Sequence, residues 1–377
     1  MQLLQDRIRG CLLGGAAGDA LGYPVEFMRL ADIRDRYGAD GITSYCPKSM
    51  YHGQAQISDD TQMTMFTANG ILCAVTRERM TGNREALRFP LTLAYQDWYW
   101  TQQTVFYDKA KPTSFGQRIS WLCDVKQLYS RRAPGNTCLS SLRHLVMDKP
   151  QITDYLTQPM NNSCGCGAVM RMAPLGMLPN ADLRQLDLEA AQVAAITHGH
   201  PLGYLSAVAL SHMIHRILFP ICDGWTLKDI AIDTANALTE LFAREPQTRI
   251  MTDLIHQAIA LSENDRKDAD NISELGEGWV GHEAFAVALY CSLRYEQDFS
   301  AGIIAAANHD GDTDSTAAIA GNILGAWLGL SNIEQKWQNN LELSEVILEL
   351  ADDLYHGLCD DTFDCTADEQ WLKKYML

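Results

Sequence analysis

The sequence predicts an all-α fold, and three observations support this class. In most segments with a regular pattern, apolar side chains recur with the 3.6-residue period of a helix that buries one face. Alternation with a period of two residues, which is typical of half-buried strands, is scarce. No Pro/Ser-rich linker or block of charge divides the chain of 377 residues. We therefore expect a single compact multi-helix domain over residues 1–377.

The expected helices follow in order along the chain. The first begins near the N-terminus and ends within residues 18–24, because the glycines and Pro24 break a helix there and favour a tight turn. Later apolar stripes predict helices at residues 63–74, 192–196, 202–218, 283–293, 317–328 and 341–354. Pro201 fits the first turn of one of them, where a proline needs no N–H partner. Residues 45–56 and 106–135 lack this periodicity, so we expect irregular structure in both.

Composition limits the class of protein. With 47% hydrophobic and 20% charged residues, the chain can bury a substantial core. Its formal charge of -17 argues against binding nucleic acid through phosphate neutralisation, but not against a small anionic substrate beside a bound metal. The 11 cysteines have no regular spacing, which is typical of reduced thiols in the cytosol. No apolar run approaches the roughly 18 residues of a membrane span, so we expect a cytoplasmic protein without membrane contact.

Two acidic clusters near opposite ends of the chain carry the strongest chemical signal. Each begins an expected helix and combines two carboxylates with hydroxyl groups, in Ser58-Asp59-Asp60-Thr61 and in Asp312-Thr313-Asp314-Ser315-Thr316. Helix capping explains one acidic residue per helix, but explains two such clusters poorly. Four carboxylates that folding brings together repel one another strongly unless a cation neutralises them. Oxygen ligands favour a hard divalent ion such as Mg²⁺, Mn²⁺ or Ca²⁺, and not zinc or copper.

Three further segments contribute candidate residues. Glu26 is expected on a loop between two apolar neighbours, where its protonation could be tuned for acid–base catalysis, although a surface glutamate is the simpler interpretation. Glycines and small residues at 161–171 let backbone N–H groups approach a phosphate, without matching a Walker loop or a dinucleotide fingerprint. His198 lies between two expected helices, and the chain has no HExxH pattern, which argues against a zinc hydrolase. Considered separately, each of these signals is weak.

Taken together and in this order, the segments resemble the ADP-ribosylglycohydrolase family, the group that includes the dinitrogenase reductase-activating glycohydrolase. The matching positions are residues 9–14, 18–22, 26, 58–62, 133–137, 165–171, 197–198, 278–279, 283–284 and 311–316. The resemblance implies an orthogonal all-α fold with a centre of two divalent cations, Mg²⁺ or Mn²⁺, in a cleft. Cysteines at 164 and 166 depart from the small or polar residues that are common in the family.

The resemblance also implies roles for individual residues. One cation would be held by Ser58, Asp59 and Asp60, and the other by Asp312, Asp314 and Ser315. The diphosphate and ribose of the substrate would contact Gly165, Cys166, Gly167 and His198. The catalytic residues would be Glu26, which closes over the ribose, and the metal-binding carboxylates Asp60 and Asp312.

We therefore expect a hydrolase that removes ADP-ribose from modified protein side chains, or from a small ADP-ribose-containing molecule, by cleaving the glycosidic bond at the anomeric carbon. Two other interpretations remain open: a non-catalytic ADP-ribose-binding module, and a dimetal phosphohydrolase that cleaves the diphosphate. A nucleic acid would be a partner only through a modified end. The sequence distinguishes neither the linkage, whether to arginine, serine or another group, nor the oligomeric state.

Overall fold

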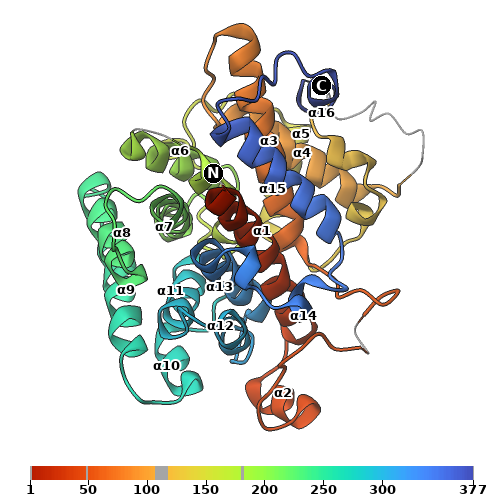
Figure 1. Cartoon of the computed structure of the whole chain (residues 1–377). Coiled ribbons are helices and arrows are strands. Elements are labelled where there is room, and N and C mark those ends of the chain that lie inside the picture. The colour runs from red at the N-terminus through yellow and green to blue at the C-terminus, as the bar shows by residue number, and fades with distance from the viewer. Residues whose placement is uncertain (1, 48–49, 107–117, 180–181, 377) are drawn as a thin grey trace.

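The computed structural model describes residues 2–47, 50–106, 118–179 and 182–376 (Figure 1). These residues form helices joined by short 3-10 turns and loops, and their β pairing is limited to isolated bridges. The predicted all-α class is confirmed. Among the described helices, none combines the length and the apolar character needed to cross a lipid bilayer.

The helices have the following bounds. They are α1 (Gln2–Gly22), α2 (Leu30–Tyr37), α3 (Asp59–Thr81), α4 (Arg88–Gln103), α5 (Asn136–Met147), α6 (Leu183–Ala195), α7 (Pro201–Leu218), α8 (Leu227–Leu241), α9 (Thr248–Ser262), α10 (Asp268–Leu275), α11 (Gly281–Arg294), α12 (Phe299–Ala306), α13 (Thr313–Leu328), α14 (Gln335–Gln338), α15 (Ser344–Cys359) and α16 (Glu369–Tyr375). In Figure 1, α1 crosses the middle of the molecule, with α7 to α11 on one side and α3 to α5 and α15 on the other.

Most predicted helices lie inside observed ones. Four apolar stripes fall in α3, α7, α11 and α13, the stripe at 192–196 extends one residue beyond the end of α6, and Pro201 is the first residue of α7. The last stripe was expected from residue 341, but α15 begins at Ser344 because Leu343 has a left-handed backbone with φ 60°. The described parts of 45–56 and 106–135 contain no α-helix, as predicted, and residues 48–49 and 107–117 lie outside the described residues.

The predicted end of the first helix within residues 18–24 is confirmed, because α1 ends at Gly22. The helix continues through Gly18 to Gly22, and only there does the 3-10 turn Tyr23–Val25, with Pro24 inside it, redirect the chain. Gly18 and Gly22 also serve packing, because residues four apart lie on one helix face. A Cβ atom at Gly18 would lie 1.9 Å from the carbonyl oxygen of Ala317, and one at Gly22 would lie 2.2 Å from that of Thr313.

This glycine face lets α1 and α13 pack backbone against backbone. At the other end of the contact, a Cβ at Gly10 would lie 2.3 Å from the carbonyl oxygen of Gly325, so the two helices run antiparallel. The C-terminal end of α1 therefore meets the N-terminal end of α13. The packing brings the segment after α1, which carries Glu26, to the acidic start of α13.

Candidate active site

A cavity of about 530 Å³ lies where the first turns of α3 and α13 approach the segment after α1. Its wall includes ten of the eleven residues that the sequence nominated: Glu26, Asp59, Asp60, Gly165, Cys166, Gly167, His198, Asp312, Asp314 and Ser315. Further lining comes from residues that were not nominated, among them Phe27, Asn136, Cys138, Met170 and Trp279. Ser58 is the nominated residue that does not line the cavity.

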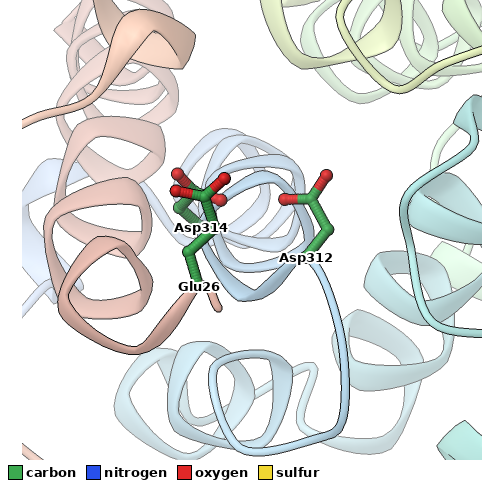
Figure 2. Close-up of side chains that lie close together, drawn as sticks. All are labelled: Glu26, Asp312 and Asp314. Carbon is green, nitrogen blue, oxygen red and sulfur yellow. The ribbon is translucent and has the colours of Figure 1, made fainter. Parts of the chain in front are cut away.

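Three carboxyl groups gather at the start of α13. Glu26, Asp312 and Asp314 are buried, and one oxygen of each lies within 4.8 Å of the others (Figure 2). The interpretation of Glu26 as a surface residue is wrong, because its exposed fraction is 8%. Burial, reinforced by the charges of Asp312 and Asp59, raises the pKa of Glu26 to about 9. These three residues could hold a cation, since oxygen donors at this separation match hard divalent ions.

The first turn of α3 adds two more carboxylates to the wall. Asp59 accepts a hydrogen bond from the Gly135 N–H at 3.3 Å, whereas Asp60 Oδ2 is buried without a partner among the described residues. Burial and the neighbouring carboxylates raise the pKa of Asp59 and of Asp60 well above the usual range. Buried acidic groups without donors are costly, so this arrangement suits an added cation.

The first turns of α3 and α13 contain both helix caps and carboxylates that line the cavity. Ser58 is the N-cap of α3 and its side chain accepts the Asp60 N–H at 3.2 Å. Asp312 is the N-cap of α13 and accepts the Ser315 N–H at 3.3 Å. The cap interpretation is therefore correct for these two residues, while Asp314 and Asp60 add carboxylates beyond what a cap requires.

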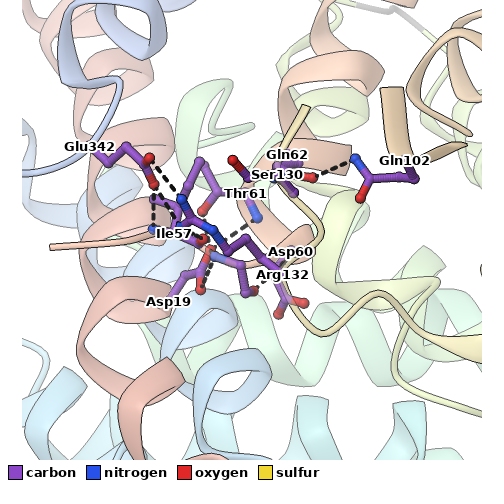
Figure 3. Close-up of polar contacts among 10 residues, drawn as sticks. Asp19, Ile57, Asp60, Thr61, Gln62, Gln102, Ser130, Arg132 and Glu342 are labelled. Atoms are coloured by element: carbon purple, nitrogen blue, oxygen red, sulfur yellow. Dashed lines mark hydrogen bonds and ion pairs between the residues drawn. The ribbon is translucent and has the colours of Figure 1, made fainter. Parts of the chain in front are cut away.

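Asp19 is a residue of the site that the sequence did not nominate. It is fully buried on α1 and accepts the Ser58 N–H and the Thr61 N–H at 3.0 and 3.1 Å (Figure 3). Burial raises its pKa to about 6, and the hydrogen bonds from Thr61 and Ser58 oppose that rise. The available signal was a carboxylate inside an apolar helical stretch, because such a group needs donors from another element.

A buried ion pair supports the loop that leads into α3. Arg132 and Glu342 form two parallel contacts at 3.0 and 3.1 Å, and Glu342 also accepts the Ile57 N–H (Figure 3). The Arg132 carbonyl accepts the Asp59 N–H at 3.1 Å. Glu342, which lies beyond the last position that matches the family, therefore supports the acidic first turn of α3.

The glycine-rich loop is held against the segment before α11. Cys166 N–H donates to the Trp279 carbonyl at 3.2 Å, and Gly165 N–H donates to Ser163 Oγ at 3.3 Å. Two of the three amides that were expected to face a phosphate are thus used within the protein. The Cys166 thiol instead reaches the acidic centre and donates to Asp312 Oδ2 at 2.8 Å.

An exposed aromatic pair stands at the cavity. The rings of Phe27 and Trp279 stack with centroids 5.8 Å apart at an angle of 17°, and Phe27 is 75% exposed. Beside them, Arg29 pairs with Glu277 at 2.8 Å. Both contacts tie the segment that carries Glu26 to the loop before α11.

Comparison with known proteins identifies the family. Residues 1–362 match the family described as ADP-ribosylglycohydrolase. A protein of Archaeoglobus fulgidus, named only as uncharacterized, is 28% identical over 356 residues, which are 93% of this chain and 97% of that protein. The ADP-ribosyl-[dinitrogen reductase] glycohydrolase of Rhodospirillum rubrum is 24% identical over 353 residues, which are 90% of this chain and 92% of that enzyme.

A solved structure shows the same fold. An ADP-ribosylglycohydrolase-related protein complex contains a chain that aligns with a TM-score of 0.62 and 21% identity, over 95% of this chain and 99% of that one. The family match covers nearly the whole length and the acidic cavity carries the nominated residues. The chain belongs to the ADP-ribosylglycohydrolase family.

Proposed function

We propose that this protein removes ADP-ribose from modified protein side chains by hydrolysing the glycosidic bond at the ribose anomeric carbon, with two divalent cations bound in the acidic cavity. The observation that carries this proposal is the buried cluster of Glu26, Asp312 and Asp314, in a chain of the ADP-ribosylglycohydrolase family. Asp59 and Asp60 on the opposing helix bring the carboxylates at the cavity to five.

The residues present fit hard cations. Glu26 Oε2 and Asp60 Oδ2 are buried without a partner among the described residues, so each has an oxygen available for a ligand. We propose that one cation is held from α3 by Asp59 and Asp60 and the other from α13 by Asp312, Asp314 and Ser315. Ser58, whose hydroxyl caps α3, is the least accessible member of the predicted set. When bound, Mg²⁺ or Mn²⁺ would orient the ribose hydroxyls and lower the pKa of a bound water.

The protein's own groups would perform the proton transfers. Asp60 would orient the attacking water while it ligates the cation. Glu26 would hydrogen-bond the ribose hydroxyls or act as an acid or base at the departing side chain. Asp312 and its neighbours would stabilise the oxocarbenium-like charge that develops on the ribose as the bond breaks.

Asp312→Asn tests the proposal directly. We expect at least a hundredfold loss of ADP-ribose release from a modified protein, together with loss of the Mn²⁺-induced rise in melting temperature. Asp265→Asn is the matched control, because Asp265 is an exposed aspartate away from the cavity. Wild-type activity in Asp312→Asn would contradict the proposal.

Product identity separates this reaction from the two alternatives. Intact ADP-ribose supports glycosidic cleavage, whereas AMP with ribose phosphate indicates a phosphohydrolase. Binding of ADP-ribose without turnover indicates a non-catalytic module. A panel of substrates modified on arginine, on serine or at a nucleic-acid end, each assayed with and without EDTA, would then assign the linkage.

A further inference from the structure

A positive charge is buried behind the wall of the cavity. Arg171 is completely buried, and its guanidinium has no carboxylate in contact among the described residues. Its Nη1 donates to the Gly167 carbonyl at 2.9 Å, its Nη2 donates to Thr197 Oγ1 at 2.7 Å, and the group lies 4.3 Å over the ring of Tyr95. A buried charge without a counter-ion in contact is costly, which suggests a function beyond packing.

The hydroxyl of Thr197 links this charge to His198. Thr197 is fully buried, and its Oγ1 lies 2.8 Å from His198 Nδ1. A guanidinium can only donate, so Thr197 Oγ1 must accept from Arg171 and keeps its own proton for another partner. The histidine nitrogen is the acceptor that this buried O–H meets, and an O–H without an acceptor would be costly. Thr197 therefore donates to His198 Nδ1.

This assignment determines which nitrogen of the histidine carries the proton. A neutral imidazole that accepts at Nδ1 has its N–H at Nε2. His198 lines the cavity, and its Nε2 would lie 3.3 Å from a Cβ atom added at either Gly165 or Gly167. Nε2 therefore lies against the glycine-rich loop that forms this wall. Burial and the charge of Arg171 lower the pKa of His198 to about 3, which keeps the ring neutral.

We propose that Arg171 and Thr197 are positioning residues that fix His198 as a neutral imidazole whose Nε2–H donates to an anionic oxygen of the substrate at the Gly165–Gly167 loop. The identity of that anion, a diphosphate oxygen of ADP-ribose, rests on the proposed function. The opposite tautomer would present a lone pair to the anion and repel it. Arg171, one layer behind, adds attraction for an anion in a chain with a formal charge of -17.

The tautomer can be measured without any substrate. Nitrogen-15 NMR of histidine-labelled protein, with the His198 signals identified by their loss in His198→Gln, reports which ring nitrogen is protonated. We expect an unprotonated Nδ1 and a protonated Nε2 throughout the range from about pH 5.5 to 8. A proton on Nδ1, or a cationic ring in this range, would overturn the proposal.

Binding of ADP-ribose, measured by calorimetry with Mn²⁺ present, tests the consequence. Thr197→Val removes the hydroxyl, and we expect about tenfold weaker binding because a hydrogen bond to a charged group is lost. Thr234→Val is the matched control, since Thr234 is equally buried but its hydroxyl donates to the Ile230 carbonyl away from the cavity. Equal affinities of Thr197→Val and wild type would contradict the proposed link.

Two substitutions of His198 test whether hydrogen-bond donation from the Nε2 position, and not only the volume of the side chain, contributes to binding. His198→Gln carries an amide near the position of Nε2, and we expect binding within about threefold of wild type. His198→Asn carries its amide near Nδ1, and we expect about tenfold weaker binding. Equal losses in both variants would overturn the donor role. If the NMR and binding results hold while no linkage is hydrolysed, the proposed function fails and this inference stands.

Discussion

Asp19 accepts the hydroxyl proton of Thr61 at 2.5 Å, so that a carboxylate of α1 caps the first turn of α3. The same carboxylate accepts the backbone N–H groups of Thr61 and Ser58. Asp59 and Asp60 lie between these two contacts in the sequence, so Asp19 fixes the backbone that presents both to the cavity. One buried residue outside the nominated set thereby orients two of the five carboxylates at the cavity.

Thr61→Val tests this capping contact. The change keeps the shape of the side chain but removes one donor from a buried carboxylate, so we expect a loss of about 1–2 kcal/mol in the free energy of unfolding. Urea denaturation in EDTA measures it. Thr81→Val, in the exposed last turn of the same helix, should change stability by less than about 0.5 kcal/mol. Equal effects of the two variants would argue against the cap.

Glu342→Gln tests the ion pair that supports the loop before α3. Side-chain exposure is 11% for Arg132 and 7% for Glu342, so the change leaves a buried guanidinium without its counter-charge. We expect a loss of about 3 kcal/mol, measured by urea denaturation. The surface pair of Arg184 and Glu240 offers a control, because Glu240→Gln should cost less than about 0.5 kcal/mol. A loss at Glu342 no larger than that would contradict the supporting role.

The raised pKa of Glu26 predicts how pH affects the metal-free protein. The folded-state pKa is about 9 and the ordinary value is 4.5, so between these values the folded protein binds the extra proton. The contribution of Glu26 to stability therefore falls as pH rises from about 5 to 9. Melting temperatures in EDTA should show this decline, and Glu26→Gln should reduce its slope. An unchanged slope in that variant would exclude Glu26 as its source.

Metal binding should show the opposite dependence on pH. A cation displaces the protons of Glu26 and of the aspartates beside it, so the affinity for Mn²⁺ should increase as pH rises through the same range. Calorimetric titration with Mn²⁺ at several pH values, in buffers of different ionisation enthalpy, would count the protons released. Affinity independent of pH, with no proton release, would be incompatible with binding at these carboxylates.

Phe27→Ala tests the aromatic contact beside Glu26. Loss of the stack on Trp279 removes about 0.5–1.5 kcal/mol of interaction between the two segments, so we expect KM for the modified protein to rise by about two- to tenfold. Phe89→Ala serves as the control, because Phe89 is also an exposed phenylalanine but lies on α4, away from the cavity. An equal change in KM for both variants would show that the effect is not specific to this contact.

The sequence by itself determined the fold class and most of the cavity wall, because both depend on local patterns. The stripes that predict α3, α7 and α13 arise from the helical period within each segment. The positions of the acidic residues are equally local, since capping places Asp59 and Asp314 in the first turn of their own helices.

Only the tertiary structure decided which distant groups support that wall. Gly18 counts as a helix breaker by local propensity, yet it lies inside α1 because contact with the backbone of α13 outweighs that preference. Asp19, Glu342 and Arg171 were not nominated because their roles depend on partners far away in the chain, or on the absence of a counter-ion. A buried polar group needs hydrogen-bond donors or acceptors, and tertiary packing supplies them from distant segments. The periodicity of a local segment does not identify these partners.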